Sequence, residues 1–197
     1  TLIHGHGGVV IGSEMSGGVQ NVVISNCILE GTDRGIRLKS RRGRGGTVED
    51  IHINNIVMKN VMCPIVMNLY YHCGKGGKES IVSNKAAQPV NDGTPRFRRV
   101  HISNVTSRET SACAGFCYGL PEMPIEDVSF HSINIHMAQD AEPGMPAMMD
   151  NLEPMRGRGF YIKNLKNVVL NNVRVEGYDG KAFTIEDCNN VRMTDCT

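Results

Sequence analysis

The chain has 197 residues, enough for one domain with a continuous core, and it does not require a second domain. Its formal net charge of +1 gives no overall field that would draw nucleic acid, so an acidic ligand has to be held by a local basic cluster. No apolar run approaches the length of a transmembrane helix. We therefore expect no nucleic-acid partner and no membrane partner.

The first stretch of the chain places a histidine between two glycines, Gly5-His6-Gly7, at the entrance to an apolar strand. Glycine lets the backbone come close to a ligand and leaves the imidazole ring unblocked. Taken alone, this tripeptide is more often a turn than a site. Glu14, which follows the strand, is a further candidate for the same site.

The next strand-like segment, residues 35–40, alternates apolar and basic side chains. Strand alternation sends Arg37 and Lys39 to one face and Ile36 and Leu38 to the other. Two neighbouring cations repel each other, so they need an anion or a solvated setting. A guanidinium beside an ammonium is a suitable receptor for a carboxylate, although a solvated basic edge would fit the isolated pair equally well.

A six-residue pattern recurs along the chain: a polar residue, an alternating apolar stretch, and then asparagine or a small substitute. Its copies occupy residues 21–26, 50–55, 99–104, 127–132, 167–172 and 190–195. A second strand-like run follows several copies, and helical periodicity is absent. Repeated short strands of this kind predict an all-β solenoid, in which each coil stacks on the next to form a parallel β-helix.

The predicted solenoid assigns two sets of residues to defined places, one in the core and one on the surface. Alternation predicts stacked inward rows formed by Val22, Ile24, Ile51, Ile53, Val100, Ile102, Val168 and Leu170. Stacked amides can bond one another and the turn backbone, so the recurring asparagine predicts a ladder on the surface. Its members would be Asn26, Asn55, Asn104 and Asn172, with Ser132 and Asp195 as imperfect ones.

We assign residues 1–197 to one partial β-helix domain with about six recognisable coils and two insertions, near 74–98 and 138–158. A solenoid absorbs extra residues as loops, often on its binding face. The methionines of the second insertion are interpreted as a loop that packs back on the helix.

The seven cysteines are an odd number, and most are interpreted as small buried apolar residues. Cys113 and Cys117 could form a local disulfide, whereas their spacing offers no second ligand pair for zinc. We expect no metal and no cofactor.

The combination of Gly5-His6-Gly7 with Arg37-Leu38-Lys39 one coil later resembles glycoside hydrolase family 28, the polygalacturonases and their relatives, which cut pectin. That family shows four signatures in order: Asn-Thr-Asp, Asp-Asp, Gly-His-Gly and Arg-Ile-Lys. This chain has the third intact and the fourth with leucine for isoleucine. Residues 12–18 and the basic run 41–44 are most similar to the exo-acting and bacterial-type branch.

The resemblance implies a role for each matching position. His6 would be the catalytic-site histidine that helps set the protonation of the catalytic aspartates. Arg37 and Lys39 would bind the galacturonate carboxylate next to the scissile bond. A functional tyrosine of the family matches Tyr71, with Tyr70 as the alternative, and a packed strand aromatic is the competing interpretation.

The first two signatures, which carry the catalytic aspartates of the family, do not occur before His6. The resemblance therefore implies a right-handed parallel β-helix that is truncated at its N-terminal side. Inverting hydrolysis needs a carboxylic acid and a carboxylate about 6.5–9.5 Å apart, and Glu14, Asp33 and Asp50 are not assigned to those roles. We expect the parent protein to hydrolyse pectic polysaccharide or oligogalacturonide with inversion, and the 197-residue chain alone to be inactive.

The alternative is a non-catalytic β-helix module that binds acidic polysaccharide. The coil pattern fits both functions, whereas His6 with Arg37 and Lys39 favours the enzyme. Arg42 could bind a further carboxylate, although a basic run of this kind is more commonly solvated.

Exo or endo action and the identity of the pectic polymer stay open. The resemblance favours a secreted or periplasmic location, and a cytoplasmic one also stays open.

Overall fold

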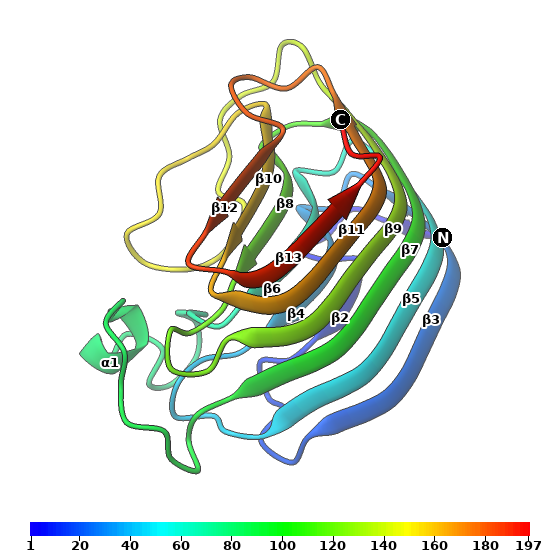
Figure 1. The fold of residues 1–197 in the computed structure, drawn as a ribbon. Coiled ribbons are helices and arrows are strands. Elements are labelled where there is room, and N and C mark those ends of the chain that lie inside the picture. The colour runs from blue at the N-terminus through cyan, green and yellow to red at the C-terminus, as the bar shows by residue number, and fades with distance from the viewer.

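The computed structural model describes residues 1–197, and parallel strands make up most of it (Figure 1). One sheet has seven strands in the order β1-β3-β5-β7-β9-β11-β13, and the other has six in the order β12-β10-β8-β6-β4-β2. Successive strands alternate between the two sheets, so each coil contributes one strand to each. The chain is an all-β right-handed parallel β-helix, as predicted.

The long strands belong to the seven-stranded sheet. They are β1 (Leu2–Ile3), β3 (Val19–Glu30), β5 (Thr47–Lys59), β7 (Arg96–Thr110), β9 (Ile125–Met137), β11 (Leu165–Glu176) and β13 (Asn189–Thr194). The six-stranded sheet contains β2 (Val9–Ile11), β4 (Arg34–Lys39), β6 (Cys63–Asn68), β8 (Cys113–Tyr118), β10 (Arg158–Lys163) and β12 (Phe183–Glu186). One short helix, α1 (Ser80–Ser83), lies in the 74–98 insertion. The chain has no helix with the length and apolar character needed to cross a membrane.

The core lies between the two sheets, and the predicted inward rows form much of it. Six of the eight predicted residues are fully buried: Ile51, Ile53, Val100, Ile102, Val168 and Leu170. Val22 and Ile24 pack against the same core but are half-buried. The reason is that β1 pairs only with Leu29 and Glu30, so most of the β3 edge has no strand beside it on that side.

The recurring asparagines lie where the long strands bend. Asn26, Asn55, Asn104 and Asn172 all have φ between 52° and 59°, the left-handed region that asparagine tolerates better than most residues. The predicted ladder is only partly formed: Asn55 Nδ2 donates to Asn26 Oδ1 at 2.6 Å, whereas the side chain of Asn104 bonds neither neighbouring coil. A weaker step joins Asn172 Nδ2 to Ser132 Oγ at 3.5 Å. The same side chain thus bends its own strand and bonds the neighbouring coil.

A second ladder, which the pattern did not predict, runs along the first residue of the last three copies. These residues also have left-handed φ values, for example 55° at both Asp127 and Asn167. Asn167 Nδ2 donates to Asp127 Oδ1 at 2.8 Å, and Asn190 Nδ2 donates to Asn167 Oδ1 at 2.9 Å. Each long strand therefore bends twice, five residues apart, which curves the seven-stranded sheet around the core.

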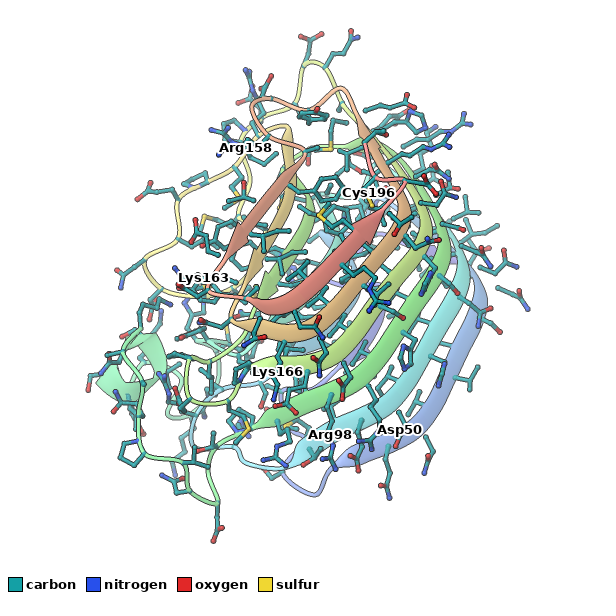
Figure 2. All side chains as sticks on the ribbon, in the orientation of Figure 1. Asp50, Arg98, Arg158, Lys163, Lys166 and Cys196 are labelled. Atoms are coloured by element: carbon teal, nitrogen blue, oxygen red, sulfur yellow. The ribbon has the colours of Figure 1, made fainter.

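The outer face of the seven-stranded sheet carries charged pairs between neighbouring strands. Figure 2 shows the side chains of Asp50, Arg98 and Lys166 projecting from this face. Arg98 Nε lies 2.6 Å from Glu49 Oε2, and Lys166 Nζ lies 3.9 Å from Glu126 Oε1. Such exposed pairs add little stability individually.

All seven cysteines are free, so the disulfide considered between Cys113 and Cys117 is not formed. Both residues lie in β8 and are fully buried. Four residues of extended strand span about 13 Å, which is well beyond the reach of a disulfide. Cys113 Sγ instead donates to the Gly115 carbonyl at 2.9 Å. Three of the seven cysteines, Cys63, Cys113 and Cys117, are buried core residues, whereas the other four are only partly buried, so the expectation that most of them are buried is wrong.

Candidate functional site

Strand β4 presents the two predicted cations on the outer face of the six-stranded sheet. Ile36 and Leu38 point into the core and are fully buried, so Arg37 and Lys39 point outward. The register places Arg37 beside Val10 of β2 on one side and Val66 of β6 on the other. Strand alternation thus produces the arrangement that the sequence predicted.

Tyr71 lies against both cations. The Arg37 guanidinium carbon is 5.5 Å from the centre of the Tyr71 ring, and Lys39 Nζ is 4.3 Å from it. Cation–π contacts of this kind hold a positive charge beside an aromatic face without neutralising it. Tyr70, the alternative, is buried, and its ring contacts Lys85 and Arg42 instead. The structure therefore brings Tyr71 to the pair.

Neither cation of this pair is neutralised by a carboxylate. The nearby acids are engaged elsewhere: Asp33 Oδ2 lies 3.3 Å from Arg34 Nη1, and Glu14 Oε1 lies 2.9 Å from Arg44 Nη2. Burial, followed by the neighbouring charge of Arg37, lowers the pKa of Lys39. Burial also lowers the pKa of Arg37. A bound anion would relieve both costs, so the pair is electrostatically suited to one.

His6 reaches the same place from the preceding coil. Its backbone carbonyl accepts a hydrogen bond from Arg37 Nη1 at 3.2 Å, and its side chain is 88% exposed. A side chain at Gly7 would collide with Val10, because its Cβ would lie 2.6 Å from Val10 Cγ2. The glycine after the histidine therefore leaves room for Val10 of its own coil, and an added Cβ would lie at an ordinary 3.5 Å from Arg37 Cδ of the next coil. The structure thus joins His6 to Arg37 through the His6 backbone, and Tyr71 links Arg37 to Lys39.

Asp33 orients the imidazole of His6. The His6 Nδ1 atom lies 2.7 Å from Asp33 Oδ2. A carboxylate can only accept, so Nδ1 carries the proton and Nε2 is left facing solvent. Sequence patterns alone gave Asp33 no role, although the register that pairs Val10 with Arg37 also brings His6 to Asp33.

The two further candidates have different surroundings. Glu14 is exposed and bonded to Arg44. Burial raises the pKa of its carboxyl, but the hydrogen bond from its own backbone N–H and the charge of Arg44 together lower it by more, so that the pKa lies below its ordinary value. Arg42 is buried and bonds both oxygens of Glu122 at 2.6 and 2.9 Å. Arg42 therefore has an internal acidic partner, whereas Arg37 and Lys39 have none.

The 138–158 insertion borders the site on the side of the following coils. Met148 Sδ lies 2.8 Å from Arg37 Nη2, and the Met148 carbonyl accepts from Asn68 Nδ2 at 3.2 Å. Arg34 Nε donates to the Pro146 carbonyl at 3.2 Å. The sequence predicts a loop that packs back on the helix but not these contacts, because the path of a long loop is not encoded in strand periodicity. No cluster of three or more His, Cys, Asp or Glu side chains suited to a metal ion occurs in the structure.

Comparison with known proteins identifies the group to which this geometry belongs. The family model described as "Glycosyl hydrolases family 28" matches residues 1–143. A probable polygalacturonase of Vitis vinifera is 30% identical over 134 residues, which cover 68% of this chain and 25% of the relative. A polygalacturonase of Ralstonia nicotianae is 42% identical over 77 residues, which cover 37% of this chain and 14% of the relative.

Among solved structures, the hyperthermoactive exopolygalacturonase from Thermotoga maritima matches with a TM-score of 0.55 and 28% sequence identity. The match covers 84% of this chain and 31% of that one. The chain thus spans about a quarter of the length of the Vitis vinifera relative and less than a third of the solved structure. The family match covers well over half of the chain, and the chain belongs to glycoside hydrolase family 28.

Proposed function

We propose that this chain supplies the carboxylate-binding part of a glycoside hydrolase that cleaves galacturonic-acid-containing pectic polysaccharide with inversion. The observation that carries the proposal is the unneutralised cation pair, Arg37 and Lys39, held against the ring of Tyr71. Family membership supports a pectin-directed hydrolase, because the relatives matched are named polygalacturonases. The activity of the whole protein is part of the proposal.

The cation pair would fix one acidic sugar. A guanidinium and an ammonium side by side can each donate a charge-assisted hydrogen bond to one carboxylate, and Tyr71 would position both donors. A methyl-esterified sugar lacks the negative charge and would lose most of that attraction. The site would therefore bind the free acid of pectin more tightly than its methyl ester.

His6 would act on protons at the reaction centre. Asp33 holds the ring through Nδ1, at 2.7 Å, and leaves Nε2 free to donate or accept a proton. Inverting hydrolysis requires an acid to protonate the leaving oxygen and a base to activate water. A histidine hydrogen-bonded to such a group would adjust its protonation. This role for His6 follows the family resemblance, and the exposed Nε2 is compatible with it.

Binding to the 197-residue chain is the appropriate readout, because the proposal concerns recognition of a carboxylate. We expect trigalacturonate to bind, and its fully methylated ester to bind much more weakly, in isothermal titration calorimetry. Arg37→Gln should weaken the acid by about 1.5–3 kcal/mol, which is roughly ten- to a hundred-fold, and should hardly affect the ester.

Lys166→Gln is the matched control, because Lys166 lies on the outer face of the other sheet beside Glu126. It should leave both affinities unchanged. Equal losses on the acid and the ester in Arg37→Gln, or no binding of trigalacturonate by the unmodified chain, would contradict carboxylate recognition at this site.

A further inference from the structure

Two histidines stand side by side on the outer face of the seven-stranded sheet, which is not the sheet that carries Arg37 and Lys39. His52 of β5 and His101 of β7 are register partners, and each lies between two buried core residues, so strand alternation turns both imidazoles outward. Their ring centres are 5.0 Å apart, with 34° between the ring planes. In Figure 1 these two strands are the adjacent cyan and green strands of the sheet.

Ser129 of β9 fixes the orientation of one of these rings. It is the next register partner in the same row, and its Oγ lies 2.8 Å from His101 Nδ1. When Nδ1 donates its proton to this oxygen, the lone pair of the neutral ring lies on Nε2. Histidines that bind metals are usually held in this way, through the ring nitrogen that does not bind. Burial, followed by repulsion from His52 and His131, lowers the pKa of His101, so the ring is neutral at pH 7.

The acids next to the pair are already engaged by an arginine. Asp50, which projects from this face in Figure 2, accepts a hydrogen bond from Arg99 Nε at 2.6 Å. Glu49 accepts one from Arg99 Nη2 at 2.7 Å. His52 and His101 therefore offer two imidazole nitrogens without a carboxylate beside them. Nitrogen donors of this kind suit late transition metals, whereas Mg²⁺ and Ca²⁺ prefer oxygen.

We propose that His52 and His101 together bind a divalent transition-metal ion through one nitrogen each, so that the metal bridges β5 and β7. A metal bonded to a ring nitrogen at about 2.1 Å lies about 3.2 Å from the ring centre. Ring centres 5.0 Å apart then give an angle of about 100° at the metal, close to the angles of tetrahedral, square-planar and octahedral complexes. Water would fill the remaining positions. The sequence predicts no metal site, because only the strand register brings these two histidines together.

Ni²⁺ is the probe, and isothermal titration calorimetry at pH 7 measures its binding. Cu²⁺ would bind more tightly, but it also oxidises thiols, and all seven cysteines of the chain are free. Mg²⁺ should show no binding that His52→Gln removes. Ni²⁺ is also paramagnetic, so substoichiometric Ni²⁺ should broaden the backbone amide signals around His52 and His101 before any others in a nitrogen–proton correlation spectrum.

The two histidines should act as one unit. His52→Gln and His101→Gln should each weaken Ni²⁺ binding about tenfold or more, because a single imidazole remains where two held the ion. The double substitution should cost little more than either single one, since either already destroys the chelate. His131→Gln is the matched control: His131 is exposed on β9, and its register partner on β7 is Ser103, so the affinity should not change.

Ser129 is a positioning residue, and its variants test the hydrogen bond to His101. Ser129→Ala should weaken Ni²⁺ binding by up to about tenfold, because the ring of His101 is no longer held. Ser129→Thr keeps a hydroxyl and should restore the affinity. Equal affinity of the alanine variant and the unmodified chain would remove Ser129 from the site.

Several outcomes would overturn the proposal. Additive losses in the double substitution would mean that His52 and His101 bind separate ions. A loss in His131→Gln as large as that in His52→Gln would mean that the ion is held by a loose group of surface histidines and not by this pair. Broadening that begins elsewhere in the chain would place the Ni²⁺ site elsewhere. The broadening experiment uses the unmodified chain, so it decides the matter even if a variant fails to fold.

Discussion

Arg42 and Glu122 form a buried bidentate ion pair, with Nε–Oε1 and Nη2–Oε2 distances of 2.6 and 2.9 Å and side-chain exposures of only 4% and 5%. Arg42 Nη1 also donates to the Ile81 carbonyl at 2.9 Å, and Nη2 donates to the Ala86 carbonyl at 3.2 Å. One guanidinium therefore fastens the 74–98 insertion, including α1, to the body of the helix.

Breaking this pair should be costly. Arg42→Gln leaves Glu122 as an uncompensated buried charge, and removing one partner of such a pair typically costs about 3–5 kcal/mol. We expect a loss of this size in the free energy of unfolding, measured by urea denaturation at pH 7. Arg44→Gln is the matched control, because Arg44 pairs with the exposed Glu14 and such surface pairs are worth about 1 kcal/mol or less. Equal effects of the two substitutions would mean that the buried pair stabilises the fold no more than an exposed pair does.

The asparagine ladder makes a second prediction, which separates backbone strain from hydrogen bonding. Asn55 has φ of 57° and donates to Asn26 Oδ1 at 2.6 Å. Asn55→Gly loses the side-chain bond but accepts the left-handed backbone, so it should cost about 0.5–1.5 kcal/mol. Asn55→Ala also incurs roughly 1–2 kcal/mol of steric strain. Urea denaturation should show a lower free energy of unfolding for Asn55→Ala than for Asn55→Gly. The reverse order would refute a conformational role for Asn55.

The fold was predictable because its signals are periodic. Alternation fixed Ile51 and Ile53 as inward residues, and the repeated asparagine marked a bend at the same place in successive coils. Each coil repeats the same physical requirement, so weak local signals add along the chain. Val22 and Ile24 are less buried than predicted because strand pairing beside them is incomplete, which alternation alone does not reveal.

The site was predictable where residues sit on strands and not where they sit on loops. Arg37 and Lys39 follow from alternation in β4. Asp33 could have been assigned from the offset between coils, since Val10 pairs with Arg37 in the same register. The positions of Met148 and Lys85 depend on how two long insertions fold back, and no period in the sequence specifies that. The ion pair of Arg42 with Glu122 likewise joins segments whose approach only the folded loops define.

Lys85 gives the last prediction, which concerns pH. Its Nζ lies 3.7 Å from the centre of the Tyr70 ring and 5.2 Å from that of Tyr118. The atom is buried and has no hydrogen-bond partner in the protein. Burial, followed by repulsion from Arg42, lowers the pKa of Lys85 from its ordinary value of 10.5 to about 8. The charged form is therefore disfavoured in the folded state.

The sign of the pH effect follows from proton linkage. Stability rises with pH wherever the unfolded state binds more protons than the folded state. Between about pH 8 and 10.5 the folded lysine has released its proton while the unfolded lysine keeps it, so the Lys85 contribution becomes less unfavourable across this window. Below about pH 8 Lys85 is protonated in both the folded and the unfolded state, so the full cost of burying its charge lowers the stability of the fold.

Lys85→Met should therefore stabilise the chain at pH 7 and progressively less as the pH rises. We expect a gain of about 1 kcal/mol at pH 7, well below the full linkage value, because the side chain is partly exposed and solvent screens its charge. Urea midpoints of the unmodified and substituted chains, compared from pH 6 to 9.5, measure the difference. Lys166→Met, at an exposed pair with Glu126, should show a flat difference over the same range. A Lys85→Met difference that does not shrink above pH 8 would mean that Lys85 keeps its charge without cost, held by the two tyrosine rings alone.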